Sequence, residues 1–567
     1  MIALICGVIL LFYIRFDQVA YSTDDTVQMN LIASGAFAPH SQYLIYSNIL
    51  YGIALKYLYL LIPSVNWYLF CGLFANLCAV ISVCCLLCRR LETVSAVPVT
   101  LIVMLFFSGN FFLSVHYTTN GFLLAVAGYF WLLHYHGHPR KRFLVPAVLF
   151  LTLSSMSRLS AFLVTIPLFC AVFAVRLFFR RAMFPDKKQR AKQAALMLLP
   201  FVIALATALP DRYAYAKDPN WSSYQERNTI RMEIQDRGFL NYPEYKALYD
   251  EAGIPMSAIN LITRWLDNDP EVYSREGLRR IADIKRGYDP ISFRLDVSLL
   301  ARSVHGVLSR FFFGQTLFPW LFVAEIIALL FRKDKERLWM MLLISGLVFA
   351  IYYALYCYGR LGIHVEAGIW LTAFMLPFGD FPASQPAEEK TEDNAEDHRK
   401  NLTLLRTAGA VFSVLLALLC AVPVIDDPQG ARLVSPPEPV NNAALAHTAL
   451  EYLRSDKAHF YVVGSLLGKG YWGAASVYDI NGLHTDDYEN ICFLGGWFAA
   501  SPVGMYHAYE KGITNPVRAL FEREDTLLAA PDEEAEWIWY FLIENYRPDI
   551  AYRKVNDNIW QFYIPSD

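Results

Sequence analysis

The chain has 567 residues, of which 55% are hydrophobic and 18% are charged, and its mean hydropathy is +0.31. Soluble domains carry roughly 25% charged residues, so this composition argues against a soluble protein. The net charge of -3 argues against a nucleic-acid partner. Apolar runs of about 17 to 25 residues recur along the chain, and each is long enough to cross a hydrocarbon core of about 30 Å. We therefore expect a polytopic protein of the cell membrane.

The first apolar run begins at Met1 and has neither a basic region before it nor a clear cleavage site, so we interpret it as a retained helix. The sequence "STDD" follows this run and places Asp24 and Asp25 side by side. One interpretation is a helix N-cap, where anions are favoured. The other is that one carboxylate acts as a general base on an acceptor hydroxyl or amine, or binds a divalent ion. Both can hold, because only one of the two acids is needed as a cap.

The next run, "SQYLIYSNILYGIALKYLYLLI" (41–62), allows two interpretations. At about 100° of rotation per residue, its polar residues, Asn48 and Lys56 among them, fall on one stripe of a helix. Such a stripe suits a helix that lies in the membrane interface. It also suits a spanning helix with a polar packing face.

Four basic clusters predict the orientation of the later helices, because Lys and Arg concentrate in cytoplasmic loops. They lie at 89–90, 139–142, 180–192 and 332–337. The spanning runs predicted between them are 66–88, 94–113, 119–134, 143–157, 160–179, 193–210, 315–331, 338–358, 361–379 and 403–424. This count leaves the polar segment 211–310 and the tail outside the cell.

Arg158 lies 16 residues after Arg142, so we expect it about 24 Å along its helix, close to the outer surface. A charge inside a membrane segment costs about 2.5 to 3.5 kcal/mol on insertion scales and therefore needs a reason. Arg158 either extends to the outer headgroups or binds a phosphate through its guanidinium fork.

Two further external turns carry polar residues. In "YGRLGIHVEAG", Arg360 is followed by His364 and Glu366, which is more than a solvated turn usually offers. In "SVHYTTNGF", His116 is either a polar turn residue or an accessory residue of a site. We count His116, His364 and Glu366 as accessory candidates.

The stretch from "DDTVQMNLIASGAF" to "YSNILYGIALKYLYLLIPSVNWYLF" resembles the start of the GT-C class of glycosyltransferases. Protein O-mannosyltransferases and lipid A aminoarabinose transferases belong to this class. The resemblance covers about residues 1–210, and its motifs are short. It implies an external acid pair and a juxtamembrane helix at 41–62.

The resemblance also implies roles for single residues. Asp24 would be the more favoured base of the pair, and Arg158 and Arg360 would contact the phosphate of a lipid carrier. His40 stands near the place of a His-Pro-Pro-like turn, but the sequence reads Pro39-His40-Ser41, which departs from that pattern. His40 and Asn48 complete the accessory candidates. The external turn at 114–122 lacks the acid that the class often carries there, which weakens any prediction of a metal site.

The resulting prediction is a GT-C-like transmembrane domain over 1–430, with about 11 spanning helices and a juxtamembrane helix. It includes the extracytoplasmic loop 211–310 and a cytoplasmic linker at 380–402. Residues 431–567 are expected to form a small extracytoplasmic α/β domain, because "HFYVVG", "IAYRKV" and "IWQFYIP" are strand-like and "EEAEWIWYFLIENY" is helix-like.

We expect a glycosyltransferase that moves a sugar from a polyprenyl-phosphate donor to an extracytoplasmic acceptor, such as a cell-envelope glycan, lipid or protein. No Gly-rich nucleotide loop is found, which fits an external enzyme without access to cytosolic nucleotide sugars. No cofactor is assigned, and a divalent metal ion stays open. The alternatives are a lipid or oligosaccharide transporter and a non-catalytic membrane scaffold.

Overall fold

The structure is a computed structural model of the full chain. It describes residues 1–16, 19–21, 24–90, 93–180, 186–236, 240–288, 296–313, 318–332, 334–359, 361–379, 451–464 and 488–565. Arg360, the linker at 380–402, the run at 403–424 and the domain boundary at 430 lie outside the described residues. Asp24 begins a helix, but its side chain also lies outside the description.

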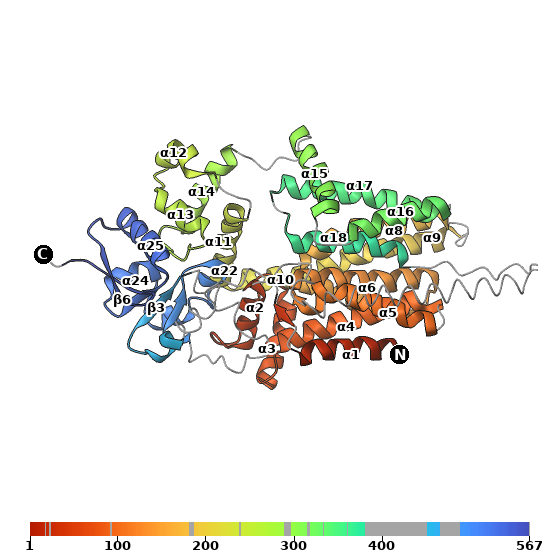
Figure 1. Ribbon diagram of the computed structural model, residues 1–567, viewed down its shortest axis with the longest axis horizontal. Helices are drawn as coiled ribbons and strands as arrows, with labels where there is room; N and C mark the ends of the chain where they lie inside the picture. Colours follow the sequence, from red (N-terminus) through yellow and green to blue (C-terminus); the bar gives the residue numbers. More distant parts are fainter. Residues whose placement is uncertain are drawn as a thin grey trace, which may run out of the picture.

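Ten helices form a bundle along the long axis of the molecule (Figure 1). They fall in the apolar runs expected from the sequence. Their bounds are α1 (Ile2–Arg15), α4 (Trp67–Leu87), α5 (Thr93–Ser108), α6 (Tyr117–Gly137), α7 (Lys141–Ser157), α8 (Leu159–Phe179), α10 (Leu199–Lys217), α16 (Phe318–Arg332), α17 (Lys335–Cys357) and α18 (Ile363–Met375).

Four helical stretches among the described residues are long and apolar enough to cross a membrane: Trp67–Leu87, Leu159–Phe179, Arg190–Lys217 and Lys335–Cys357. Helices α1, α5, α16 and α18 are apolar but shorter, and α6, with 21 residues, is not among the stretches that meet both criteria. The predicted count of about 11 spans therefore goes beyond what these helices show by length and composition.

Helix α6 is the centre of the bundle, and most of its residues are buried against α4, α7, α8 and α18. Gly368 lets α18 approach α6 closely, because a Cβ atom at this position would lie 2.0 Å from the ring of Phe122. Any larger residue at 368 would push the two helices apart. This contact fixes the start of α18, which carries His364 and Glu366, beside the start of α6.

Two short helices lie between the first two bundle helices, α2 (Asp24–Ser34) and α3 (Ile49–Leu61). The 13 residues of α3 extend about 20 Å, which is less than a hydrocarbon core of about 30 Å. Just before α2, strand β1 (Ala20–Tyr21) pairs in parallel with β2 (Ser114–Val115). This pairing brings the start of α2, with its two acids, next to the start of α6.

A second group of helices follows α10 and stands at the far end of the bundle (Figure 1). We call these α11 (Pro219–Gln235), α12 (Tyr242–Glu251), α13 (Met256–Thr263) and α14 (Arg275–Tyr288) the loop helices. Helix α11 starts at a cap in which the side chain of Asp218 accepts hydrogen bonds from the backbone N–H groups of Asn220 and Trp221. The helix α15 (Val297–Phe313) then returns to the bundle and packs on α17.

The tail forms a five-stranded sheet with short helices, as the sequence predicts. The strand order is β4-β3-β5-β7-β6; β3 is parallel to β4 and β5, and β7 is antiparallel to both of its neighbours. The strands are β3 (Phe460–Val463), β4 (Ile491–Phe493), β5 (Thr526–Ala529), β6 (Ala551–Asn556) and β7 (Ile559–Tyr563), and the helices are α22 (Gly496–Ala499), α23 (Tyr506–Glu510), α24 (Pro516–Glu522) and α25 (Asp532–Asn545). The predicted strands at 459–464, 550–555 and 559–565 and the helix at 533–546 are confirmed. We call the described residues from 451 onward the tail domain.

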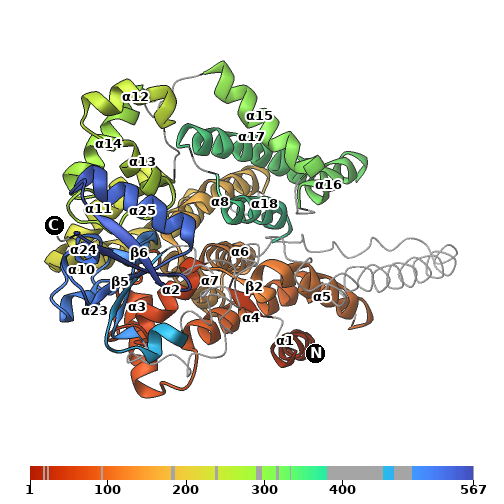
Figure 2. The same ribbon diagram turned by 60° about the vertical axis from the view of Figure 1, so that its left-hand side comes forward.

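In the sheet of the tail domain, strands β3, β4 and β5 are buried on both faces, whereas most of β6 is exposed. One face, with Tyr461 and Phe493, shares a hydrophobic core with Phe37 and other residues that follow α2. The other face, with Val462 and Cys492, packs in a core that includes residues of the loop helices and α25. Figure 2 shows the tail domain lying against the loop helices and α2. Because successive side chains of a strand point to opposite faces, these strands pack on the residues after α2 with one face and on the loop helices with the other.

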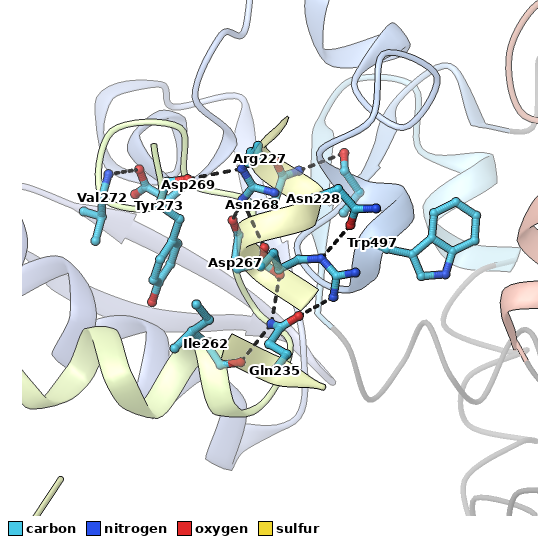
Figure 3. A network of polar contacts seen from close by, with 12 residues as sticks. Arg227, Asn228, Gln235, Ile262, Asp267, Asn268, Asp269, Val272, Tyr273 and Trp497 are labelled. Carbon is cyan, nitrogen blue, oxygen red and sulfur yellow. Dashed lines mark hydrogen bonds and ion pairs between the residues drawn. The ribbon is translucent and has the colours of Figure 1, made fainter. Parts of the chain in front are cut away.

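The loop after α13 anchors the loop helices to the tail domain through Asn268 (Figure 3). The side-chain amide of Asn268 donates to the carbonyl oxygens of Phe493, at 2.8 Å, and Ala499, at 3.2 Å. The neighbouring Asp269 accepts a hydrogen bond from the hydroxyl of Tyr546 at 2.6 Å, and burial raises the pKa of its carboxyl group. The two hydrogen bonds of Asn268 are buried and that of Asp269 is partly buried, so the loss of one partner would leave the other partner unsatisfied.

We predict that Asn268→Ala lowers the stability of the protein by about 1 to 3 kcal/mol, because two buried carbonyl groups lose their donor. Asn220→Ala is the control, because Asn220 is an exposed residue in the first turn of α11. Thermal unfolding in detergent measures both. Equal midpoints for the two variants would contradict the anchoring role.

Candidate functional site

Asp25 lies between the bundle and the tail domain. Its Oδ2 accepts a hydrogen bond from the hydroxyl of Tyr117 at 3.4 Å, and its Oδ1 accepts one from the indole N–H of Trp497. Tyr117 begins α6, and Trp497 belongs to α22, so the acid is held by residues far apart in sequence. Its neighbour Asp24 is the first residue of α2.

Arg158 occupies the turn between α7 and α8 and is extended, with φ −157° and ψ 101°. Its guanidinium lies over two tyrosine rings, with Cζ 4.9 Å from the centroid of Tyr46 and 5.2 Å from that of Tyr117. Its Nη1 donates to the carbonyl oxygen of Tyr46 at 3.2 Å. Within the part of the chain that the structure describes, Arg158 has no carboxylate partner. The described contacts to its positive charge are thus two ring faces and a carbonyl dipole.

The backbone beside Arg158 is strained at Ile45, where φ is +69°. A β-branched residue rarely adopts this conformation, and such strain concentrates at functional sites. The loop is held by the backbone N–H of Ile45, which donates to the hydroxyl of Tyr215 at 2.8 Å. The hydroxyl of Ser47 holds it as well by donating to the carbonyl of Ser157 at 2.9 Å. The strained turn thereby presses Tyr46 onto Arg158.

The side chain of Tyr46 links Arg158 to the loop helices and the tail domain. Its hydroxyl accepts a hydrogen bond from Arg231 at 3.5 Å, and its ring meets that of Trp497 edge-on at 5.0 Å. Arg231 is fully buried and lies on α11. Burial raises the pKa of Tyr46, so its hydroxyl stays protonated.

His116 and His364 lie beside Tyr117. The ring of His116 stacks on that of Tyr117 at 4.2 Å and on that of His364 at 3.9 Å. The Nδ1 of His116 accepts the backbone N–H of Thr118 and so caps α6. Burial lowers the pKa of His116, so the ring is neutral and its hydrogen lies on Nε2. Three candidates from separate parts of the sequence, Asp25, Arg158 and the histidine pair, thus meet around Tyr117.

Other candidates have separate surroundings. The carboxylate of Glu366 accepts a hydrogen bond from Tyr352 on α17 at 2.5 Å, inside the bundle. Asn48 caps α3, and its amide donates to the carbonyl of Thr207 on α10 at 2.8 Å. His40 packs on Gly35, where a Cβ atom would lie 2.7 Å from its ring. These contacts give the three residues roles in packing.

Sequence reasoning missed four residues of this site: Tyr46, Tyr117, Arg231 and Trp497. Tyr117 could have been found, because it directly follows the candidate His116 in an external turn. The other three are placed by the tertiary structure, and no local pattern marks them. Among the described residues, no group of three or more His, Cys, Asp or Glu side chains could hold a metal ion.

No protein-family model, no curated protein and no solved structure matches this chain.

The strain at Ile45 predicts that glycine is more stabilising than alanine at this position, whereas alanine is usually the more stabilising of the two inside a helix. Both Ile45→Gly and Ile45→Ala remove the side chain, but only glycine adopts a positive φ without cost. We predict that the Gly variant is more stable than the Ala variant by about 1 to 2 kcal/mol. At Ile53, an exposed position inside α3, alanine should instead be better by about 1 kcal/mol. Thermal unfolding of the four variants measures these differences. If alanine were the more stable variant at both positions, the backbone at Ile45 would not be strained.

Proposed function

We propose that this protein is an integral membrane glycosyltransferase of the GT-C type, which transfers a sugar from a polyprenyl-phosphate donor to an extracytoplasmic acceptor. The observation that carries the proposal is that an acid, Asp25, and a guanidinium, Arg158, contact the same tyrosine, Tyr117, and that Arg158 has no carboxylate partner among the described residues. These are the two groups that a single displacement needs.

The chemistry assigns one role to each group. A carboxylate of the Asp24–Asp25 pair takes the proton from the acceptor hydroxyl or amine, whose heteroatom attacks the anomeric carbon. The bond between that carbon and the phosphate oxygen breaks on the opposite side, and the phosphate leaves with the electron pair. The Arg158 guanidinium stabilises the charge that develops on the phosphate. Because the acceptor attacks opposite the leaving phosphate in a single displacement, the transfer is inverting.

The polar surroundings of Arg158 support its role. Among the described residues, its contacts are a carbonyl oxygen and two neutral rings, so a phosphate would displace none of the described anions. The neutral His116 offers a further N–H donor next to it. We place Arg360 at the same phosphate by the resemblance alone.

The proposed setting is a multi-pass protein in which the site, the loop helices and the tail domain lie outside the cell. The four basic clusters then face the cytoplasm, as the distribution of Lys and Arg in membrane proteins predicts.

The direct test is the transfer of a radiolabelled sugar from polyprenyl-phosphate sugar to endogenous acceptors in membranes that contain the protein. An enzyme transfers the label, whereas a lipid or oligosaccharide transporter or a scaffold does not. Membranes that lack the protein serve as the control.

For the acids, we predict that Asn substitution of the residue that acts as base lowers transfer by about 10²- to 10⁴-fold. Asp24→Asn and Asp25→Asn are measured separately, with expression and thermal stability as controls. Full transfer by both single variants would leave the acids with capping alone.

For Arg158, we predict that Lys keeps partial activity, because the charge stays while the fork is lost, and that Gln removes most of it. The measurement is the transfer rate against donor concentration, normalised to inserted protein. A residue that only reaches the headgroups would make Gln harmless. Equal rates for Gln and wild type at every donor concentration would therefore refute the phosphate role.

For the orientation, we predict that a cysteine at the exposed Lys511 of the tail domain reacts with an impermeant maleimide in intact cells. A cysteine at the exposed Lys187, in the third basic cluster, should react only after the membrane is opened. The reverse pattern would contradict the proposed orientation.

A further inference from the structure

The backbone around Trp497 is held by hydrogen bonds to the loop helices and the loop after α13. Trp497 follows Gly496, whose φ of +83° makes a tight turn after β4. The backbone N–H of Gly496 donates to the carbonyl of Trp265 at 2.7 Å, and the carbonyl of Trp497 accepts the hydroxyl of Tyr224 at 2.8 Å. The loop helices thus hold the backbone on both sides of the indole.

The indole is directed at the candidate base. Trp497 is 3% exposed, and its ring lies edge-on to Tyr46. Its N–H donates to Oδ1 of Asp25, which is a charge-assisted hydrogen bond when the carboxylate is ionised. The other oxygen, Oδ2, keeps the Tyr117 hydroxyl at 3.4 Å, which is long for an O–H···O hydrogen bond.

We propose that the tail domain is part of the active site and that Trp497 is a positioning residue for Asp25. This inference rests on the proposed function, in which an acid of this pair is the base. Trp497 holds Oδ1, so that Oδ2 is oriented to take the proton of the acceptor, with the acceptor hydroxyl replacing the long contact to Tyr117. An acid on a short helix would otherwise rotate among several conformations, and fixed orientation is a large part of catalysis.

The test replaces the indole N–H without removing the ring. Trp497→Phe should lower kcat by roughly 10- to 100-fold, the effect of losing one hydrogen bond to a charged group. The KM for the donor should change little, because the donor phosphate is held by Arg158. Trp539→Phe and Trp560→Phe are matched controls, because these two residues of the tail domain donate their indole N–H to the backbone carbonyls of Ile550 and Ala530.

The pH dependence separates positioning from a loss of packing. The N–H stabilises the ionised carboxylate, so its loss should move the acidic limb of the rate profile to higher pH. Among the described side chains, the other titratable groups at this place are Tyr117, Tyr46, Arg158, His116 and His364, with Arg231 and Asp236 acting on Tyr46. None of them is changed in Trp497→Phe, so the shift reports on the lost hydrogen bond.

A double variant tests the coupling to Asp25. If Trp497 acts through Asp25, adding Trp497→Phe to Asp25→Asn should lower the rate no further. Tyr224→Phe is a milder second variant, because it releases the carbonyl of Trp497 without touching the indole, and a rate loss smaller than that of Trp497→Phe is expected. A Trp497→Phe variant with the rate and pH profile of Trp560→Phe would overturn the inference, while loss of transfer in Asp25→Asn would still support the base. Full transfer by both Asp24→Asn and Asp25→Asn would overturn the proposed base and this inference together.

Discussion

The positive charge of Arg158, held without a carboxylate partner among the described residues, is the constraint on which the rest of the site depends. A guanidinium in an apolar bundle must be stabilised, and here two tyrosine rings and one carbonyl do so. This requires Tyr46 to face inward, which the strained turn at Ile45 enforces. It also requires Tyr117 to start α6 at the same level, which brings its hydroxyl to Asp25.

The tail domain is integrated with the bundle, because both faces of β3, β4 and β5 are buried against other parts of the chain. Residues after α2 share a core with one face, and the loop helices share a core with the other. The position of Asp25 therefore depends on the folding of segments more than 400 residues away. A sheet that served only as a separate appendage would expose one of these faces to solvent.

The bundle helices and the tail strands could be predicted from the sequence, whereas the external position of Asp25 was expected from the resemblance, and Tyr117 as its common contact with Arg158 was missed. Apolar runs set the helices, and a rise of 1.5 Å per residue set the depth of Arg158. Trp497 and Arg231 could not be predicted, because tertiary contacts and no local pattern place them at the site. Glu366 and Asn48 were chosen for their polarity, but each satisfies a buried hydrogen bond between helices. Polar residues in a helix bundle either form a site or satisfy a buried hydrogen bond between helices, and the sequence alone does not distinguish these two roles.

The central claim is that a lipid phosphate binds at Arg158, within reach of the acid pair. A cryo-electron microscopy structure of the protein with polyprenyl phosphate in lipid nanodiscs tests it most directly. The account predicts phosphate density within hydrogen-bond distance of the Arg158 guanidinium, on the side of Tyr117 that faces Asp25, with Trp497 still on the acid. Phosphate density elsewhere, with the Tyr46 and Tyr117 rings and the carbonyl of Tyr46 unchanged around Arg158, would contradict it.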